Sequence, residues 1–326
     1  MAGEIRIGTS GWSYPAGRGS WNGIFYPRAG TRRGRRFDEL AYYADHFNTV
    51  EVNSTFYRLP SVATARSWAE RTPHGFEFSV KLYQAFTHPG MMVGTSGAQE
   101  PPAGLEKAPP VPVVTAQDVD EFRDSIEPLA QAGKLGAVLA QFPPSYKQTP
   151  QTVDYLEWLL RSLADYAVAV ELRDRTWSDS LATTLALLNQ HRAAWVQIDE
   201  PKFRLSVRQN RLPNVSEVYY MRLHGRNAER WWKHEKSEDR YDYLYSPDEL
   251  KPFAETAAAV RTIVRKAYLY LNNHFAAKAV ADALELKHQL GEPITGEYGA
   301  ELLDSYPFLR QIPGCVAQNA LLPPPA

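Results

Sequence analysis

Short apolar segments rich in Val, Ile, Leu and Tyr alternate along the chain with stretches of helical spacing. Most of these stretches are amphipathic, and several begin near Ser or Asp, residues that cap helices. The apolar segments are 4–8, 49–53, 76–82, 135–142, 167–173, 193–199, 218–224 and 267–273. The predicted helices are 37–47, 61–72, 116–133, 152–165, 179–191 and 246–264.

This alternation predicts an α/β fold, a (β/α)8 TIM barrel in one domain spanning residues 1–326. An open doubly wound sheet is the alternative, but no glycine-rich phosphate turn follows the first segment. Residues 200–217, between strands 6 and 7, show no helical pattern. Residues 97–113 predict a Pro-rich flexible loop insertion after strand 3, and 321–326 a frayed tail.

Polar residues alternate with apolar ones inside the predicted strands. In the second strand Glu51 and Asn53 point away from Val50 and Val52. If the valines face the helices, the carboxylate and the amide face the barrel axis. The same test places these polar residues on the axis: Arg6, Ser10, Glu77, Ser79, Lys81, Gln141, Glu171, Arg173, Gln197, Asp199, Arg222, His224, Tyr270 and Asn272.

The charges of this axial set balance, with four residues of each sign. Because an unpaired buried charge costs several kcal/mol, we expect mutual pairing. For Arg6 and Glu77, near strand starts, we interpret the pairing as structural. Charges at strand ends are interpreted as functional, because barrel active sites lie at that face. The balanced residues are Arg6, Lys81, Arg173 and Arg222 against Glu51, Glu77, Glu171 and Asp199.

The strand ends supply the candidate site. Lys81, Arg173 and His224 fall at one height and predict binding of a phosphate or carboxylate. A Schiff-base role for Lys81 ranks lower, because adjacent carboxylates would keep its amine charged. The candidate catalytic residues are Glu51, Lys81, Glu171, Asp199 and His224. The candidate substrate-binding residues are Ser10, Trp12, Tyr14, Asn53, Gln141, Arg173, Trp177, Arg222, Asn272 and His274.

Aromatic residues follow nearly every predicted strand. Trp12, Tyr14 and Trp177 each lie within a few residues of a polar strand end, so we expect them to face a ligand. Such rings stack on sugars or nucleobases. The alternative is that aromatics of this kind fix loops onto the barrel.

Composition indicates the broad class of the protein but does not identify a binding partner. The formal net charge of −1 gives no global positive field, and the single cysteine, Cys315, suits a reducing compartment. No signal-peptide pattern opens the chain, and no window approaches a membrane span. We therefore expect a cytoplasmic protein that acts on a small, anionic molecule and has no membrane partner. The sequence gives no indication of oligomeric state.

Two alternatives concern other ligands. No motif identifies a cofactor, but a divalent metal is an alternative, because the strand ends carry suitable ligand types without a diagnostic spacing. A nucleic-acid contact is the second, based on the basic run 31–36 with Arg226 and Arg230. The residues of suitable type for a metal are Glu51, Glu171, Asp199, His224 and His274.

Several long motifs carry a resemblance to a known family. They are GTSGWSYP (8–15), FYP (25–27), FNTVEVNSTFYRLP (47–60), FSVKL with TH (78–88), LGAVLAQFPPSY (135–146), VAVELRDRTW (168–177), MRLHGR (221–226) and YLYLNNH (268–274). Together they closely resemble the YecE-like family, or domain of unknown function 72, over nearly the whole chain. The resemblance implies a (β/α)8 barrel of unestablished reaction. The chain departs from the family pattern at 15–23 and near Ala276, where a glycine is expected.

Three classes of function stay open. The leading hypothesis is an enzyme of hydrolase, lyase or isomerase type that acts by general acid/base chemistry on a small anionic or sugar-like substrate. Glu171 or Asp199 would transfer the proton, and the cationic residues would hold the substrate's charge. The second is a nuclease or nucleic-acid-binding barrel, by analogy with endonuclease IV. The third is a non-catalytic ligand-binding protein.

Overall fold

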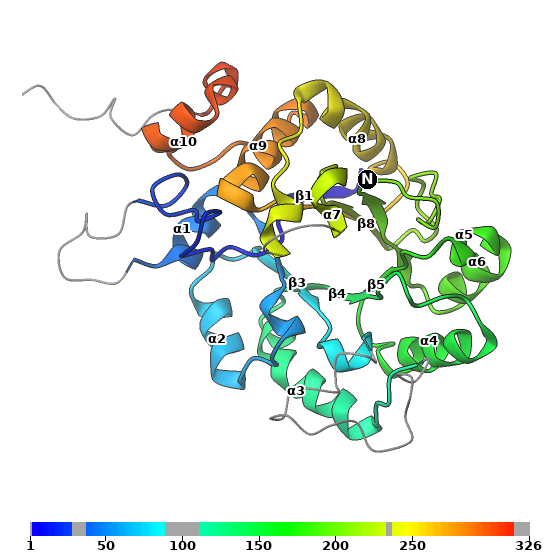
Figure 1. Ribbon diagram of the computed structural model, residues 1–326. Coiled ribbons are helices and arrows are strands. Elements are labelled where there is room, and N and C mark those ends of the chain that lie inside the picture. Colours follow the sequence, from blue (N-terminus) through cyan, green and yellow to red (C-terminus); the bar gives the residue numbers. More distant parts are fainter. Residues whose placement is uncertain (1, 28–36, 89–110, 233–236, 316–326) are drawn as a thin grey trace, which may run out of the picture.

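The computed structural model describes residues 2–27, 37–88, 111–232 and 237–315 (Figure 1). The predicted insertion at 97–113 lies largely outside these residues, and the predicted tail 321–326 and the basic run 31–36 lie wholly outside them. Within the described ranges, no helix is long and apolar enough to cross a bilayer. The assignment of a single domain over 1–326 stays a prediction.

Each apolar segment predicted as a strand contains one, and the strands pair in parallel. The segment 193–199 holds two short strands separated by Val196. The strands are β1 (Glu4–Thr9), β2 (Thr49–Val52), β3 (Glu77–Lys81), β4 (Leu135–Gln141), β5 (Val168–Glu171), β6 (Ala194–Trp195), β7 (Gln197–Asp199), β8 (Val218–Leu223) and β9 (Lys266–Leu271).

Each predicted helix is present, and several begin at a side-chain cap, as at Ser61, Thr115 and Ser246. No helix lies between β7 and β8, as predicted. The alternation missed α9, in which residues 279–287 are all buried. The helices are α1 (Glu39–His46), α2 (Val62–Glu70), α3 (Ala116–Gln131), α4 (Pro150–Ser162), α5 (Arg175–Asp179), α6 (Leu181–Gln190), α7 (Ala228–Trp232), α8 (Pro247–Val260), α9 (Lys278–Leu290) and α10 (Ala300–Ser305).

The strands form two parallel sheets surrounded by helices, a barrel-like arrangement whose ladder is not continuous (Figure 1). One sheet has the order β1-β9-β8-β7 and the other β2-β3-β4-β5-β6. Between β1 and β2 the hydroxyl of Tyr43 interrupts the ladder. It accepts from the Thr9 amide (2.9 Å) and donates to the Thr49 carbonyl (3.1 Å). The unbroken ladder of the predicted barrel is therefore replaced here by a side-chain bridge.

The two sheets remain linked at both junctions. Past Tyr43, the Gly11 amide donates to the Glu51 carbonyl (2.7 Å). Gly8 permits this approach, because a Cβ there would lie 2.3 Å from the Thr49 oxygen. At the other junction the Val196 amide donates to Val170 of β5 (2.9 Å), and the next residue pairs with β8.

Polar side chains fill the space between the sheets, and their apolar neighbours face the helices. At the strand starts, Glu4, Arg6, Glu77, Lys266 and Tyr268 form what we call the strand-start network. Its closest contacts join Glu77 to Lys266 Nζ (2.6 Å) and to the Tyr268 hydroxyl (2.5 Å). Arg6 Nε lies 3.2 Å from Glu77, so the structural pair expected there is present.

Candidate functional site

A second buried network lies at the carboxyl ends of the strands, centred on Arg222 of β8. Its Nε and Nη2 donate to Glu51 of β2 (2.9 and 2.7 Å), and its Nη1 donates to Glu171 of β5 (2.5 Å). Ser10 and Tyr220 also donate to Glu51, both at 2.7 Å. Burial opposes the charge of Arg222, but Glu171 and Glu51 raise its pKa above the ordinary value. Glu51 and Glu171 are fully inaccessible to solvent.

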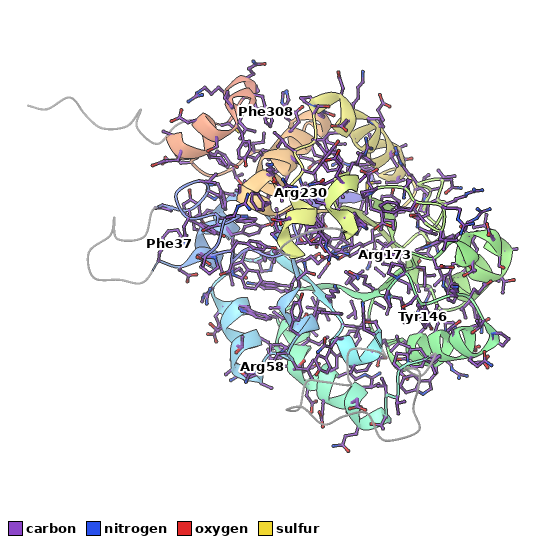
Figure 2. All side chains as sticks on the ribbon, viewed as in Figure 1. Phe37, Arg58, Tyr146, Arg173, Arg230 and Phe308 are labelled. Atoms are coloured by element: carbon purple, nitrogen blue, oxygen red, sulfur yellow. The ribbon has the colours of Figure 1, made fainter. Side chains whose placement is uncertain are left out.

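Arg173 continues this network outward. Its Nε donates to Glu171 (2.6 Å), and its Nη1 lies 3.4 Å from Glu200, just past β7. Figure 2 shows Arg173 near the centre of the ring of helices. Burial alone would raise the pKa of Glu171, but Arg173 and Arg222 hold it well below its ordinary value. We call Glu51, Gln141, Glu171, Arg173, Glu200 and Arg222 the strand-end network.

His224 packs against this network without a charge of its own. Burial, reinforced by Arg222, lowers its pKa to about 3. The Asn272 amide nitrogen lies 2.8 Å from Nδ1 and donates to it. Nε2 lies 3.2 Å from Arg173 Nη2, which can only donate, and 3.5 Å from Glu171 Oε1. His224 is therefore a neutral side chain at neutral pH that contacts both members of the Arg173–Glu171 pair.

Lys81, the last residue of β3, approaches the network from another side. Its side chain is partly exposed, and its Nζ lies 4.1 Å above the ring of Phe56. Among the described residues no carboxylate lies within 4 Å of this amine. Burial lowers the pKa of Lys81 to about 7; Arg222 adds to the lowering, and Glu171 and Glu51 oppose it.

The carboxylates expected to keep Lys81 charged are already bound by Arg222 and Arg173, and they only partly oppose the effect of burial on its pKa. His88 lies beside Lys81 and also stays neutral, since burial, followed by the charge of Lys81, lowers its pKa to about 3.

Asp199 is held in a different cluster from the one that the charge balance predicted. Arg226 binds it through Nε and Nη2 (2.8 and 3.0 Å), and the Tyr245 hydroxyl donates to it (2.7 Å). Arg226 lies beyond the end of β8, outside the strand alternation. Asp199 thus has a full set of partners away from Arg173 and Arg222.

Several predicted substrate-binding residues do lie at the strand ends. Gln141 accepts from Arg222 Nη1 (3.1 Å). The ring of Tyr14 stacks on His274 at 4.4 Å, and its hydroxyl donates to the Ser10 carbonyl. Burial lowers the pKa of His274 to about 4. Asn53 begins the turn after β2, and its side-chain oxygen has no hydrogen-bond partner in the described structure.

Two of the aromatics predicted to face a ligand make their described contacts with other protein groups. Trp177 is fully buried, donates to the Tyr146 carbonyl (2.8 Å) and stacks on its ring. Figure 2 shows Tyr146 farther out than Arg173, beside α4. Trp12 packs edge-on against Trp68 and Phe78 on the helix side of the sheet. The alternative reading, that such rings fix loops, applies to both.

A cleft of about 370 Å³ opens beside Arg173 and Glu200. Lys147 and Arg204 add positive charge to its walls, and Phe203 and Trp231 add apolar surface. In the described part of the chain, no three His, Cys, Asp or Glu side chains are grouped to hold a metal ion. The charged side chains that line the cleft are the cationic Lys147, Arg173 and Arg204 and the acidic Asp174 and Glu200.

Sequence reasoning missed three residues of this site. Tyr220 has the same parity as Arg222, so the alternation could have placed it on the axis. Glu200 follows the last residue of β7, and His88 lies beyond β3, where strand parity no longer applies. Their proximity to Arg173 and Lys81 depends on loop conformation, for which the sequence carried no signal.

In the loop after β9, alanine stands near position 276, where the family pattern leads one to expect glycine. Ala276 and Ala277 have φ of 52° and 63°, the left-handed region that favours glycine. The Ala276 amide donates to the Gly19 carbonyl (3.0 Å), and the Tyr306 hydroxyl donates to the Ala276 carbonyl (2.5 Å). These contacts from two other segments hold the strained backbone beside His274.

Comparison with known proteins agrees with the resemblance. The family described as "Protein of unknown function DUF72" matches residues 6–301. The UPF0759 protein YunF of Bacillus subtilis is 26% identical over 306 residues, which cover 90% of this chain and 96% of YunF.

Two solved structures of DUF72 family proteins have the same fold. The protein from Thermotoga maritima is 33% identical, with a TM-score of 0.71 over 88% of this chain and 99% of that one. The protein from Enterococcus faecalis is 22% identical, with a TM-score of 0.73 over 89% and 96% of the two chains. The chain therefore belongs to the DUF72 family.

Proposed function

We propose that the protein is an enzyme that acts by general acid/base chemistry on a small anionic substrate at the carboxyl ends of the strands. The observation that supports this most directly is the amine of Lys81. It stands at a strand end without a carboxylate partner in the described structure, while Glu51 and Glu171 are held by arginines. An amine with a pKa near 7 can accept a proton at neutral pH.

Glu200 is the complementary acid. It lies across Arg173 from the centre of the network, and its Oε2 makes no hydrogen bond to a described residue. Burial raises its pKa, and Arg173 only partly offsets the rise. One acid with a raised pKa and one amine with a lowered pKa form the pattern expected of a proton-transfer pair. Glu171, in contrast, remains ionised and keeps Arg173 and Arg222 in place.

The substrate's charge is inferred from the cleft beside Glu200. Lys147, Arg173 and Arg204 line it, so a phosphate or carboxylate group finds several cationic donors there. A sugar-like body would meet Phe203 and Trp231. A small anionic or sugar-like molecule is therefore the substrate class that this surface supports.

We also infer that the strands complete a closed (β/α)8 barrel, with β6 and β7 acting as one strand. Hydrogen bonds from Gly11 to Glu51 and from Val196 to Val170 support this closure at the two junctions. The axial side chains then lie inside one lumen, and the strand-end network forms the floor of its open face.

The test is a turnover screen with Lys81→Met. Wild-type protein is incubated with phosphorylated and carboxylated metabolites, and consumption is followed by NMR. We expect Lys81→Met to lower turnover by about 10²–10⁴-fold while substrate binding persists. Turnover should rise as pH increases through about 7, because the base is the deprotonated amine.

The matched control is Lys251→Met, which removes an exposed lysine of α8. It should leave turnover unchanged. Equal turnover in wild type and Lys81→Met would contradict the assigned role of Lys81. Binding without turnover of any bound compound would favour the non-catalytic alternative.

The nucleic-acid alternative has less support from the described residues. Arg226 is engaged by Asp199 through two hydrogen bonds, and Arg230 lies 3.9 Å from Asp242. A salt-dependent affinity for DNA would restore it.

A further inference from the structure

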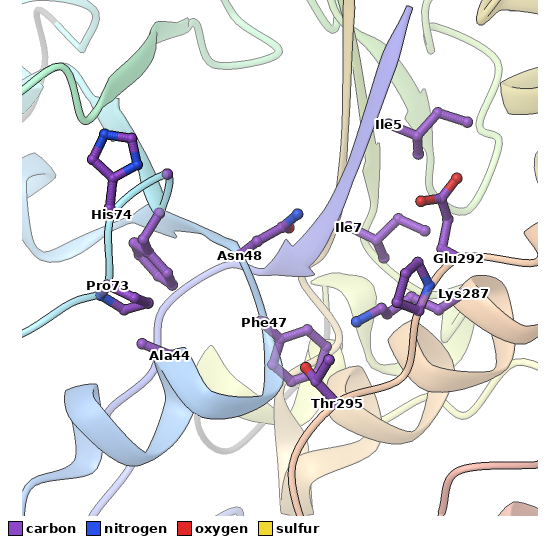
Figure 3. A pocket seen from close by; sticks show the side chains of 13 residues that line it. Ile5, Ile7, Ala44, Phe47, Asn48, Pro73, His74, Lys287, Glu292 and Thr295 are labelled. Atoms are coloured by element: carbon purple, nitrogen blue, oxygen red, sulfur yellow. The ribbon is translucent and has the colours of Figure 1, made fainter.

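A second cavity, of about 200 Å³, lies at the amino ends of the strands, away from the strand-end network (Figure 3). Ile5 and Ile7 of β1, Phe47 after α1 and Phe76 before β3 form its apolar walls. Asn48, Pro73, His74 and Gly75 at its rim are exposed to solvent, so a small molecule can reach it.

One wall of this cavity carries a buried amine. Lys287, in the last turn of α9, is 8% exposed, and Figure 3 shows its amine between Ile7 and Phe47. The amine makes one long hydrogen bond, 3.3 Å to the His46 carbonyl. It has two further N–H groups and no other hydrogen-bond acceptor among the described residues.

No carboxylate neutralises this amine. Glu292 lines the same cavity, but its carboxylate accepts from Arg261 (2.8 Å), and no ion pair within 4 Å joins it to Lys287 in the described structure. Burial lowers the pKa of Lys287 to about 8, with Glu292 opposing the shift. The amine therefore remains mainly protonated at neutral pH.

A buried cation without a counterion is costly, and a structural role explains only one of its three donors. The bond to His46 satisfies a carbonyl at the end of α1, as basic residues do at helix ends. The amine also lies 5.5 Å from the centroid of the Phe47 ring, and Ile5, Ile7 and Phe47 line the cavity beside it. The cavity thus combines one positive charge with apolar walls.

We infer that this cavity binds a small monocarboxylate with an apolar body, its carboxylate on Lys287 and its hydrocarbon part against Ile5, Ile7 and Phe47. The volume sets the size, because a dry cavity of roughly 150 Å³ accepts benzene. An aromatic or branched-chain monocarboxylate fits this space. The inference does not depend on the proposed function.

Binding at this cavity would reach the strand-start network. Arg6 Nη1 donates to the carbonyls of Asn48 and Gly75 (2.9 and 2.7 Å), and both of these residues line the cavity. The same guanidinium lies beside Glu77. A bound carboxylate would therefore stabilise the strand starts without touching Lys81 or Glu200.

The test uses benzoate as the anionic probe and benzyl alcohol as its uncharged counterpart. Binding is followed by NMR through the methyl groups of Ile5 and Ile7. We expect benzoate to shift both methyl signals in wild-type protein and to bind at least tenfold more weakly to Lys287→Met. Lys251→Met should bind benzoate as wild type does.

Benzyl alcohol provides a measurement that needs no variant. If Lys287→Met does not fold, at least tenfold tighter binding of benzoate than of benzyl alcohol to wild type still supports the charge requirement. Equal affinity for the two probes, or the absence of any benzoate-induced shift at Ile5 and Ile7, would overturn the inference. Turnover at the strand ends has no part in either readout.

Discussion

The strand-start and strand-end networks contain the same kinds of charged side chain, but they differ in how fully these charges are paired. At the strand starts Glu4, Arg6, Glu77 and Lys266 pair in a closed set of two acids and two bases. At the strand ends the network contains the acids Glu51, Glu171 and Glu200 and the bases Arg173 and Arg222, and Lys81 beside it adds a third base. That set is balanced in number, yet not every member is paired.

Lys81 and Glu200 are the members with the weakest pairing, and they are the informative ones. Lys81 has no carboxylate within 4 Å in the described structure, and Glu200 has only a 3.4 Å ion pair. The pKa of the amine falls and that of the carboxyl group rises, because burial opposes both charges. A stabilising network would pair these two groups with each other. Their separation is what distinguishes the functional end of the strands from the structural end.

The largest expected effect is that of Arg222→Met on stability. It leaves Glu51 and Glu171 buried without their shared counter-charge, and only Arg173 remains for Glu171. Breaking a buried pair in this way costs about 3–5 kcal/mol. Urea denaturation should show this loss in the free energy of unfolding.

Lys266→Met is the matched change at the strand starts. Glu77 keeps Arg6 and the Tyr268 hydroxyl, and Lys266 is already partly exposed. A smaller loss, roughly 1–3 kcal/mol, is expected for one hydrogen bond to a charged group. If Lys266→Met were as destabilising as Arg222→Met, the two networks would not differ as described.

The next effect concerns acid sensitivity and His224. Its pKa is about 3 in the folded protein, whereas an unperturbed histidine titrates near 6.5. Between these values the unfolded chain binds a proton that the folded protein does not, so stability falls as pH falls through this window. His224→Gln should reduce the slope of unfolding free energy against pH by up to about 1.4 kcal/mol per pH unit.

The His224 prediction is checked by denaturation at pH values between 4 and 7 in both proteins. Burial also lowers the pKa of His88 and of His274, and both residues remain in the variant, so their contributions cancel in the comparison. Parallel curves for wild type and His224→Gln would show that His224 is charged in the fold.

Strand parity predicted the axial positions well, because in a parallel sheet it depends only on the backbone. Glu51, Glu171 and Arg222 converge for this reason. Parity could not choose partners, and so it grouped Asp199 with the axial arginines although Arg226, from the loop after β8, binds it. Parity also made no prediction for Glu200 and His88, because both residues lie beyond the ends of their strands.

Strand parity likewise makes no prediction about the direction of aromatic side chains in the loops beyond the strands. The indole N–H of Trp177 donates to the carbonyl of Tyr146, in the loop between β4 and α4. Tyr14 bonds the Ser10 carbonyl at the strand end and therefore stays beside the site.

The last expected effect has the opposite sign and belongs to Lys81. Below pH 7 its amine is charged in both states, and burial of that charge disfavours the folded protein. Lys81→Met should therefore be at least as stable as wild type at pH 6. Between about 7 and 10.5 the folded protein has released a proton that the unfolded chain still holds, so wild-type stability rises with pH. Thermal denaturation should therefore show that any stability advantage of Lys81→Met over wild type becomes smaller as pH rises from about 7 to 10.5. An advantage that stayed constant from pH 6 to pH 10 would mean that another group neutralises Lys81, and the distinction between the two networks would lose its main support.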